Sequence, residues 1–185
     1  MRFFIALEIP SENIPSFQAI QAKLHILIPQ AKLTNPDKIH LTLAFLGEQE
    51  DSLKDKLTQI IKVSAEGISS FEVTPAYIDG FSDIHHPSIL WVGVKGDIDK
   101  VLLLRERIKD SLTSLNLPVD ERRFIPHISI AKFNKPIKID QILEANLEKI
   151  IPGELNPIKV TSIKLFESVP NEGFHKHNTL AEITL

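Results

Sequence analysis

The chain is 185 residues long, which suits a single compact domain or two small lobes that share a core and excludes a large multidomain protein. Hydrophobic residues make up 43% of it and charged residues 24%, so disordered and collagen-like classes are excluded as well. A net charge of −3 excludes a protein that is basic over its whole surface, the absence of cysteine excludes disulfides and thiolate catalysis, and no apolar run approaches the roughly 20 residues that span a bilayer.

The first half of the chain predicts strands that alternate with helices. Apolar periodicity predicts, in chain order, strand 2–9, helix 17–27, strand 39–46, helix 53–61 and strand 71–78. Asp51 or Ser52 is the expected N-cap of the second helix, and Gly67 is its expected C-terminal stop. Asp79-Gly80 is a typical turn sequence, and we expect it to close this half.

The second half repeats this order and adds one strand. The expected elements are strand 89–94, helix 101–115, strand 124–133, helix 142–150, and strands 158–166 and 174–185. We therefore predict an α+β fold that forms one bilobal domain over residues 1–185, with approximate sequence halves 1–80 and 88–185. Each half would be a β-α-β-α-β unit, and the antiparallel or mixed sheets of these two pseudo-symmetric units would flank a central cleft.

Two matching segments support a duplication. His40-Leu41-Thr42-Leu43-Ala44 in the first half has the same residue class at every position as His127-Ile128-Ser129-Ile130-Ala131 in the second. Positions 40 and 127 differ by 87, and the landmarks Phe3 and Ile89 of the two opening strands differ by 86. Two independent landmarks with nearly one period predict two lobes related by a pseudo-two-fold axis.

These segments carry the residue types that phosphate chemistry needs. Alternate side chains of a strand share a face, so His40 points the same way as Thr42, and His127 points the same way as Ser129. The hydroxyls can donate hydrogen bonds to phosphate oxygens, while one imidazole removes a proton and the other supplies one. Histidine suits both roles because its ordinary pKa of about 6.5 lets neutral and protonated forms coexist near neutrality. Neither a metal nor a covalent intermediate is required.

With these motifs the chain resembles the 2H phosphoesterase superfamily, and within it the bacterial and archaeal RNA 2',3'-cyclic phosphodiesterases, also called 2'-5' RNA ligases. Besides the two His-x-Thr/Ser motifs, the resemblance rests on Met1–Leu7, Phe45-Leu46-Gly47, Ser88–Val94 and Phe124-Ile125-Pro126. It implies hydrolysis of a 2',3'-cyclic phosphate at an RNA end to a 2'-phosphomonoester, with 2'-5' ligation in some members.

The same resemblance implies a role for each motif residue and no cofactor or metal. His127 would be the proton acceptor that activates water, and His40 would be the proton donor to the departing 3' oxygen. Thr42 and Ser129 would bind the phosphate. The alternatives are another cyclic or 2'-5'-linked substrate, such as ADP-ribose cyclic phosphate or a 2'-5' oligoadenylate, and a non-catalytic module that binds RNA or a nucleotide.

The chain departs from the family at positions where arginine is common. Ile125 and Lys132 stand there, and lysine lacks the bidentate fork with which arginine binds phosphate. Strand alternation places Lys132 opposite His127 unless the strand bends, so its contact with substrate is expected from the resemblance. Arg123 shares the parity of His127 and is a second candidate for substrate contact.

Other histidines and aromatic residues have simpler interpretations. His175 and His177 alternate on a strand, where they either ligate a metal or, as we favour, face solvent or line the edge of the cleft. Alternation places Phe45 on the core face, away from His40, and Trp91 is expected in the core or between the lobes. We expect a cytoplasmic monomer that acts on RNA ends, with no membrane contact and no obligate protein partner.

Overall fold

Four α-helices and nine strands make up the structure, a computed structural model that describes residues 1–153 and 155–185. The strands are β1 Arg2–Glu8, β2 Lys32–Leu33, β3 His40–Glu48, β4 Phe71–Phe81, β5 Ile89–Gly96, β6 His127–Lys132, β7 Ile158–Val160, β8 Ser162–Asn171 and β9 Phe174–Thr184. The helices are α1 Ile14–Leu27, α2 Lys54–Ala65, α3 Ile98–Ser114 and α4 Gln141–Glu148. Short 3₁₀ turns lead into α1, β3 and α2, at Ser11–Asn13, Pro36–Lys38 and Asp51–Leu53.

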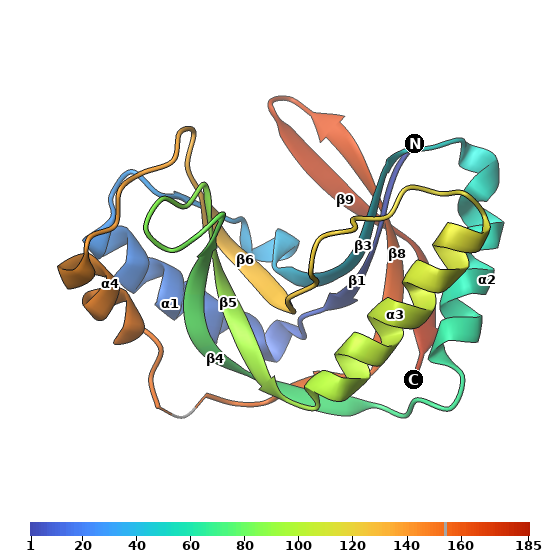
Figure 1. Ribbon diagram of the computed structural model, residues 1–185, viewed down its shortest axis with the longest axis horizontal. Coiled ribbons are helices and arrows are strands. Elements are labelled where there is room, and N and C mark those ends of the chain that lie inside the picture. The colour runs from blue at the N-terminus through green and yellow to red at the C-terminus, as the bar shows by residue number, and fades with distance from the viewer. Residues whose placement is uncertain (154) are drawn as a thin grey trace.

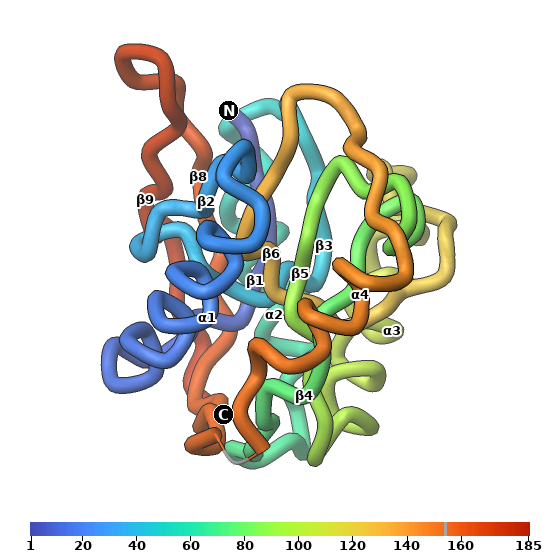
Figure 2. The backbone as a smooth tube through the Cα atoms, turned by 90° about the vertical axis from the view of Figure 1, so that its left-hand side faces the viewer, coloured from blue at the N-terminus to red at the C-terminus, as the bar shows by residue number. Residues whose placement is uncertain are grey.

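The strands form one antiparallel sheet that bends into two lobes. Its order is β7-β4-β5-β6-β3-β1-β8-β9, and β2 is added beside β6. Helices α1 and α4 cover the lobe of β4, β5 and β6, whereas α2 and α3 cover the lobe of β3, β1, β8 and β9 (Figure 1). The tip of the β8–β9 hairpin extends beyond the rest of the fold (Figure 2). The α+β class and the bilobal architecture expected from the sequence are confirmed.

The sheet is pseudo-symmetric about the junction of β6 and β3. From that junction β6, β5 and β4 follow in one direction, and β3, β1 and β8 follow in the other. Strand β4 comes from the first half of the chain yet pairs with β5, whereas β8 comes from the second half yet pairs with β1. Each lobe therefore draws strands from both sequence halves, 1–80 and 88–185.

Two strand boundaries expected from the sequence are wrong for tertiary reasons. Asp79-Gly80 does not turn, because both residues continue β4 in register with β5. Glycine fits at position 80 because a Cβ there would lie 2.7 Å from the Cβ of Pro87. The single strand expected over 158–166 is two strands, since β7 pairs with β4 in one lobe and β8 pairs with β1 in the other.

Local signals at the element ends are correct only in part. The strand expected over 124–133 begins at His127. Neither Asp51 nor Ser52 caps α2, because both lie in the preceding 3₁₀ turn and Leu53 occupies the N-cap position without a side-chain hydrogen bond. Gly67 follows the end of α2 with a φ of +76°, a conformation that favours glycine, as expected for a helix stop.

A β-bulge interrupts each of the two strands that carry the motifs. Leu43 of β3 has no partner in β1, where consecutive residues pair with positions 44 and 42. Ile130 of β6 has no partner in β5, where consecutive residues pair with positions 131 and 129. The two bulged positions differ by 87, the same period that relates the motifs. Because a bulge inserts one extra residue, the side chains that follow it lie on the opposite face of the sheet from the one that simple alternation predicts.

Buried polar side chains from two helices bind the carbonyls at the bulges. Nη1 of Arg105 on α3 donates to the Leu43 carbonyl at 2.8 Å. Nε2 of Gln21 on α1 donates to the Ile130 carbonyl at 3.0 Å. Arg105 is 6% exposed and Gln21 is 4% exposed. The Ile130 carbonyl also accepts from the Thr34 backbone N–H at 2.9 Å. Because buried carbonyls are stabilised by hydrogen-bond donors, these contacts stabilise the bulges.

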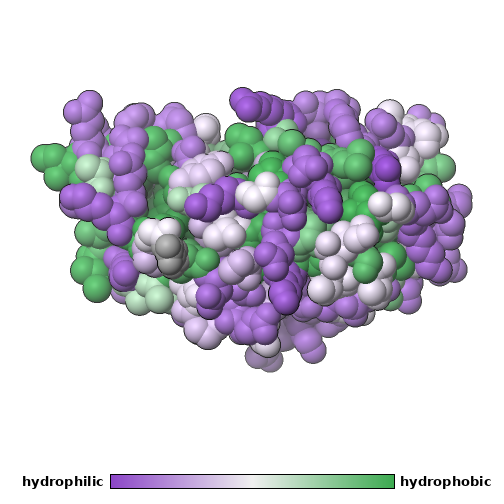
Figure 3. Space-filling model, turned by 90° about the horizontal axis from the view of Figure 1, so that it is seen from below, coloured by the Kyte–Doolittle hydropathy of each residue, from purple (hydrophilic) through white to green (hydrophobic). Residues whose placement is uncertain are grey.

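The apolar core lies between the sheet and the helices. Strand alternation correctly predicts the buried side chains of the motif strands, each of which is at most 1% exposed: Leu41, Leu43, Ile128 and Ile130. The face seen from below intersperses hydrophobic residues among hydrophilic ones (Figure 3). Within residues 1–153 and 155–185, no helix combines the length and the apolar character needed to cross a membrane.

A Gln21→Leu variant should have a free energy of unfolding lower by about 1–3 kcal/mol, because leucine keeps most of the volume but removes one donor from the carbonyls of Thr34 and Ile130. Urea unfolding measures the difference. Gln18→Leu, on the exposed face of the same helix, is the matched control and should stay within about 0.5 kcal/mol of the wild type. Equal stabilities of the two variants would contradict the role of Gln21.

Candidate active site

The motif strands meet at the centre of the sheet through one ladder pair, Leu41 opposite Ile128. In an antiparallel pair the chains run in opposite directions, so position 40 faces position 129 and position 42 faces position 127. The side chains of this ladder pair are buried in the core, whereas those on either side of it are half-buried. The structure thus brings together the four motif residues, which we name the quartet: His40, Thr42, His127 and Ser129.

His127 is held in one tautomer by a backbone hydrogen bond. Its Nδ1 lies 2.7 Å from the carbonyl oxygen of Ile125. Because a carbonyl only accepts, Nδ1 carries the proton and Nε2 keeps a free lone pair. Burial lowers the pKa of His127 below its ordinary value, although the hydrogen bond to Ile125 opposes this shift. Its ring packs edge-on against Phe81, with 4.9 Å between ring centroids, and in a tilted arrangement against Trp91, with 5.5 Å between centroids.

His40 has an equivalent environment in the other lobe. Burial, with further contributions from His177 and His127, lowers its pKa to about 4, although a hydrogen bond with the Lys38 backbone opposes this shift. The ring stacks on Phe4 with a centroid distance of 5.0 Å. Each catalytic candidate is therefore a desolvated imidazole that contacts the backbone two residues earlier, and burial favours the neutral form of both in the free protein.

Phe45 does not belong to the core, so its expected position is wrong. It is 54% exposed, with its ring 6.3 Å from that of Phe4 and 5.7 Å from the guanidinium carbon of Arg2. The bulge at Leu43 explains the error, because alternation counted from His40 reverses at the extra residue. Phe45 therefore shares the face of the sheet that carries the quartet.

Lys132 reaches the same side by the same mechanism. Simple alternation placed Lys132 on the face opposite His127 unless the strand bends, and the bulge at Ile130 provides this bend. Lys132 is exposed, whereas Ala131 and Phe133 are buried. Position 132 is the equivalent of Phe45 under the 87-residue period. The two bulges thus place one aromatic and one basic side chain symmetrically on the two sides of the junction.

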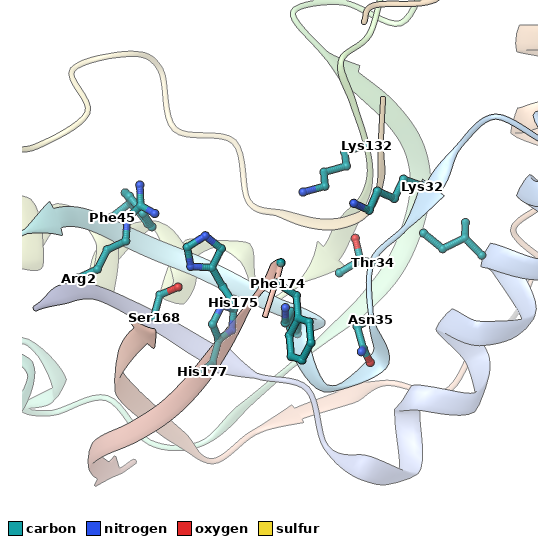
Figure 4. Close-up of a pocket in the computed structure, with 13 residues that line it drawn as sticks. Arg2, Lys32, Thr34, Asn35, Phe45, Lys132, Ser168, Phe174, His175 and His177 are labelled. Carbon is teal, nitrogen blue, oxygen red and sulfur yellow. The ribbon is translucent and has the colours of Figure 1, made fainter. Parts of the chain in front are cut away.

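A cavity of about 610 Å³ opens on this side of the sheet, and we name it the basic pocket (Figure 4). Its charged and aromatic lining comprises Arg2, Lys32, Lys38, Phe45, Lys132 and Phe174, together with two histidines of β9. No quartet residue lines it, but it adjoins the quartet, because the lining His177 has its ring 5.4 Å from that of His40. In Figure 4 the amino groups of Lys32 and Lys132 lie close together at one side of the pocket.

His177 is a site residue whose role the sequence did not reveal. His175 and His177 both line the basic pocket, which agrees with the expectation that they face solvent or line the edge of the cleft. The ring of His177 also packs on Phe4 at 4.8 Å. Within the part of the chain that the structure describes, no group of three or more His, Cys, Asp or Glu residues is arranged to hold a metal. The His-x-His spacing was the available signal, but only the pairing of β9 with β8 shows that it faces His40.

Arg123 lies outside the strand on which its predicted parity depended. Strand β6 starts at His127, and Arg123 is exposed in the preceding coil. Its charge acts on Tyr77 of β4, where it opposes the rise in the phenol pKa caused by burial and by Asp79. Arg123 does not line the basic pocket. Contact with substrate therefore stays a prediction for this residue.

The sequence model of the 2'-5' RNA ligase superfamily matches residues 10–168. The chain belongs to this superfamily. The resemblance inferred from the two His-x-Thr/Ser motifs is thereby confirmed. Among curated members, the RNA 2',3'-cyclic phosphodiesterase of Bacillus subtilis is 31% identical over 134 residues, which cover 70% of each chain. The protein of the same name from Aeropyrum pernix is 22% identical over 159 residues, which cover 86% of this chain and 88% of that one.

The fold of this chain is similar to that of a solved structure. The TT0787 protein of Thermus thermophilus aligns with a TM-score of 0.79 at 20% identity. The alignment covers 100% of this chain and 98% of that one. This chain thus shares its fold with that protein despite the low sequence identity.

A His177→Gln variant should have a higher His40 pKa than the wild type, because charge on His177 opposes protonation of His40. NMR titration of the His40 ring should give a midpoint near pH 4 in the wild type and a midpoint closer to 6.5 in the variant. His175→Gln, in the same pocket, is the matched control and should change the midpoint less. An unchanged His40 titration in His177→Gln would contradict the electrostatic contact.

Proposed function

We propose that the protein hydrolyses 2',3'-cyclic phosphate ends of RNA to 2'-phosphomonoesters by metal-independent acid–base catalysis. The observation that carries the proposal is the quartet, in which two desolvated imidazoles and two hydroxyls surround one ladder pair. Superfamily membership supports it, because the cited curated members are named RNA 2',3'-cyclic phosphodiesterases. In this scheme His127 is the proton acceptor, His40 is the proton donor, and Thr42 and Ser129 bind the phosphate.

The reaction is a single displacement at phosphorus. Nε2 of His127 removes a proton from water as its oxygen forms the new bond to phosphorus. The bond from phosphorus to O3' breaks, and His40 transfers a proton to that oxygen. The products are a 2'-phosphomonoester and a 3'-hydroxyl group. The proton gained by His127 and the proton lost by His40 are exchanged with solvent, so the protein is regenerated.

The arrangement of the quartet suits this in-line geometry. His40 and His127 occupy diagonal positions across β3 and β6. In a regular antiparallel pair such diagonal positions lie about 7–8 Å apart, enough for a phosphoryl group between them. The remaining diagonal carries Thr42 and Ser129, whose hydroxyls can donate to the two non-bridging oxygens. Acid and base therefore lie on opposite sides of the phosphorus, as attack and departure require.

Binding of the substrate supplies the protonated histidine. Both pKa values are lowered in the free protein, that of His40 to about 4. An anionic phosphate beside an imidazole favours its protonated form and raises its pKa. The neutral His127 is ready as the base before binding, whereas His40 becomes the acid in the complex.

His40→Ala and His127→Ala should each lower kcat by roughly 10²–10⁴-fold, because each removes one positioned proton transfer. Turnover of a 2',3'-cyclic nucleotide in excess chelator measures the effect, and phosphorus NMR identifies the 2'-phosphate. His86→Ala is the matched control, because His86 has the same His-x-Ser spacing but is exposed in the loop before β5. Loss of wild-type turnover in chelator would contradict metal independence, and binding without product would favour a non-catalytic module.

The acid and base roles are distinguished by a substrate in which sulfur replaces the 3' oxygen of the cyclic phosphate. Sulfur departs as a stable thiolate and needs no proton donor. The sulfur substrate should therefore restore much of the activity of His40→Ala and little of that of His127→Ala. Rescue of His127→Ala alone would reverse the two roles. The substrate class is tested by comparing turnover of the RNA cyclic phosphate with that of ADP-ribose cyclic phosphate and of a 2'-5' oligoadenylate at equal concentrations.

The pH profile of kcat/KM should be bell-shaped with its maximum below pH 6.5. Activity needs one neutral and one protonated histidine, so the maximum lies between the two pKa values of the free protein. Both are below the ordinary value, and that of His40 is about 4. Activity falls at higher pH as the acid loses its proton and at lower pH as the base gains one. A maximum of kcat/KM above pH 7 would contradict the lowered values.

A further inference from the structure

The basic pocket concentrates positive charge in a chain whose net charge is −3. Its lining includes Arg2, Lys32, Lys38 and Lys132 and no aspartate or glutamate. In residues 1–153 and 155–185, none of these four cations lies within 4.0 Å of a carboxylate oxygen. Nε of Arg2 is buried without a hydrogen-bond partner in that part of the chain. The charge of Asp37 acts on the lining His177, but among the described residues the four cations have no carboxylate in ion-pair contact, so the pocket suits an anion.

Two of these cations are held together by the sheet itself. Lys32 of β2 pairs directly with Lys132 of β6. Like charges at directly opposite positions of an antiparallel pair are destabilising. The two amino groups lie near each other at the rim of the pocket (Figure 4). An anion bound between them would remove the repulsion, and a phosphodiester group has the required charge.

Exposed aromatic rings accompany the cations. Phe45 is 54% exposed with Arg2 over its ring, and Phe174 is 55% exposed with Nζ of Lys38 5.3 Å from its ring centroid. Both rings line the basic pocket. Proteins that bind single-stranded nucleic acid combine basic grooves with aromatic side chains on which bases stack. The pocket therefore offers partners for a base as well as for a phosphate.

The pocket adjoins the quartet, so a strand whose reacting nucleotide lies at the quartet can continue into it. It adjoins the quartet through His177, whose ring is 5.4 Å from that of His40. A cyclic phosphate occupies the 3' end of its strand, so the strand extends only through the 5' oxygen of the reacting nucleotide. The volume of about 610 Å³ lies within the range of roughly 300–1,000 Å³ typical of small-ligand sites and suits one nucleotide.

We infer that the basic pocket binds the phosphodiester and the base immediately upstream of the reacting nucleotide, and that it thereby selects RNA strands over mononucleotides. Lys32 and Lys132 bind the phosphodiester, and Phe45 stacks with the upstream base. This inference rests on the proposed function, because it assumes that the reacting nucleotide lies at the quartet.

The test compares three substrates: uridine 2',3'-cyclic phosphate, the same nucleotide with a 5' phosphate, and a dinucleotide that ends in it. The wild type should have a kcat/KM for the dinucleotide at least roughly 10-fold above that for the mononucleotide. Lys32→Ala should lower this ratio about tenfold, and it should also lower the corresponding ratio of kcat/KM for the 5'-phosphorylated nucleotide to that for the mononucleotide. Phe45→Leu should lower the dinucleotide ratio and leave the ratio for the 5'-phosphorylated nucleotide unchanged. Lys62→Ala, on α2, is the matched control and should leave every ratio unchanged.

Salt dependence gives a second measure. The slope of log kcat/KM against log salt for the dinucleotide should become less steep by roughly 0.7 in Lys32→Ala, as for the loss of one phosphate contact with a single strand. A wild-type ratio near one, or a Lys32→Ala effect that is equal with and without the 5' phosphate, would overturn the inference.

The inference can fail separately from the proposed function. If the wild type turns over none of the three substrates, the proposed function fails. Binding of unreactive 3'-phosphate analogues then tests the pocket alone. Tighter binding of the dinucleotide than of the mononucleotide, weakened by Lys32→Ala, would support the pocket. Equal binding of both analogues would overturn it.

Discussion

The structure of the site depends on how β3 and β6 separate on either side of a single ladder pair. In an antiparallel ladder the Cβ atoms of directly facing residues lie only about 4.5–5.5 Å apart, whereas the two histidines occupy the wider diagonal. Leu41 and Ile128 hold the strands together in the core, while the bulges at Leu43 and Ile130 bend both strands away from a continuous ladder. A buried side chain of a neighbouring helix donates to the carbonyl at each bulge, and the Ile130 carbonyl also accepts from the Thr34 backbone, so both bulges are stabilised.

Desolvation then determines the chemistry of the two imidazoles. Each ring lies against aromatic neighbours and contacts its own backbone, so its neutral form is favoured until an anion arrives. The quartet contains no side chain that is always charged, because it consists of two histidines and two hydroxyl residues. In the proposed reaction its protonation state is coupled to the substrate, whose negative charge would stabilise the imidazolium ion. The neutral His127 meanwhile keeps a lone pair on Nε2, because Nδ1 is committed to a carbonyl.

Recognition of a polyanion by an acidic protein requires that the positive charge be local. In this chain β2 lies beside β6, so that basic residues distant in sequence line one pocket, as the proposed recognition of RNA requires. The pocket and the quartet lie on the same side of the sheet because the bulges redirect Phe45 and Lys132. The same irregularity of the strands thus opens the reaction site and equips its surroundings.

Alternation along the two motif strands is sufficient to predict the buried Leu41 and Ile128 and the shared face of each histidine and hydroxyl, because neighbouring residues alone decide these directions. It fails beyond the bulges, where Phe45 is exposed, and it is silent on His177, which β9 brings to His40. The sequence by itself therefore determined the duplicated motifs and the α+β class. Tertiary structure alone decided which strands pair across the lobes and which side chains join the pocket, because helix donors and strand partners far along the chain set the bulges.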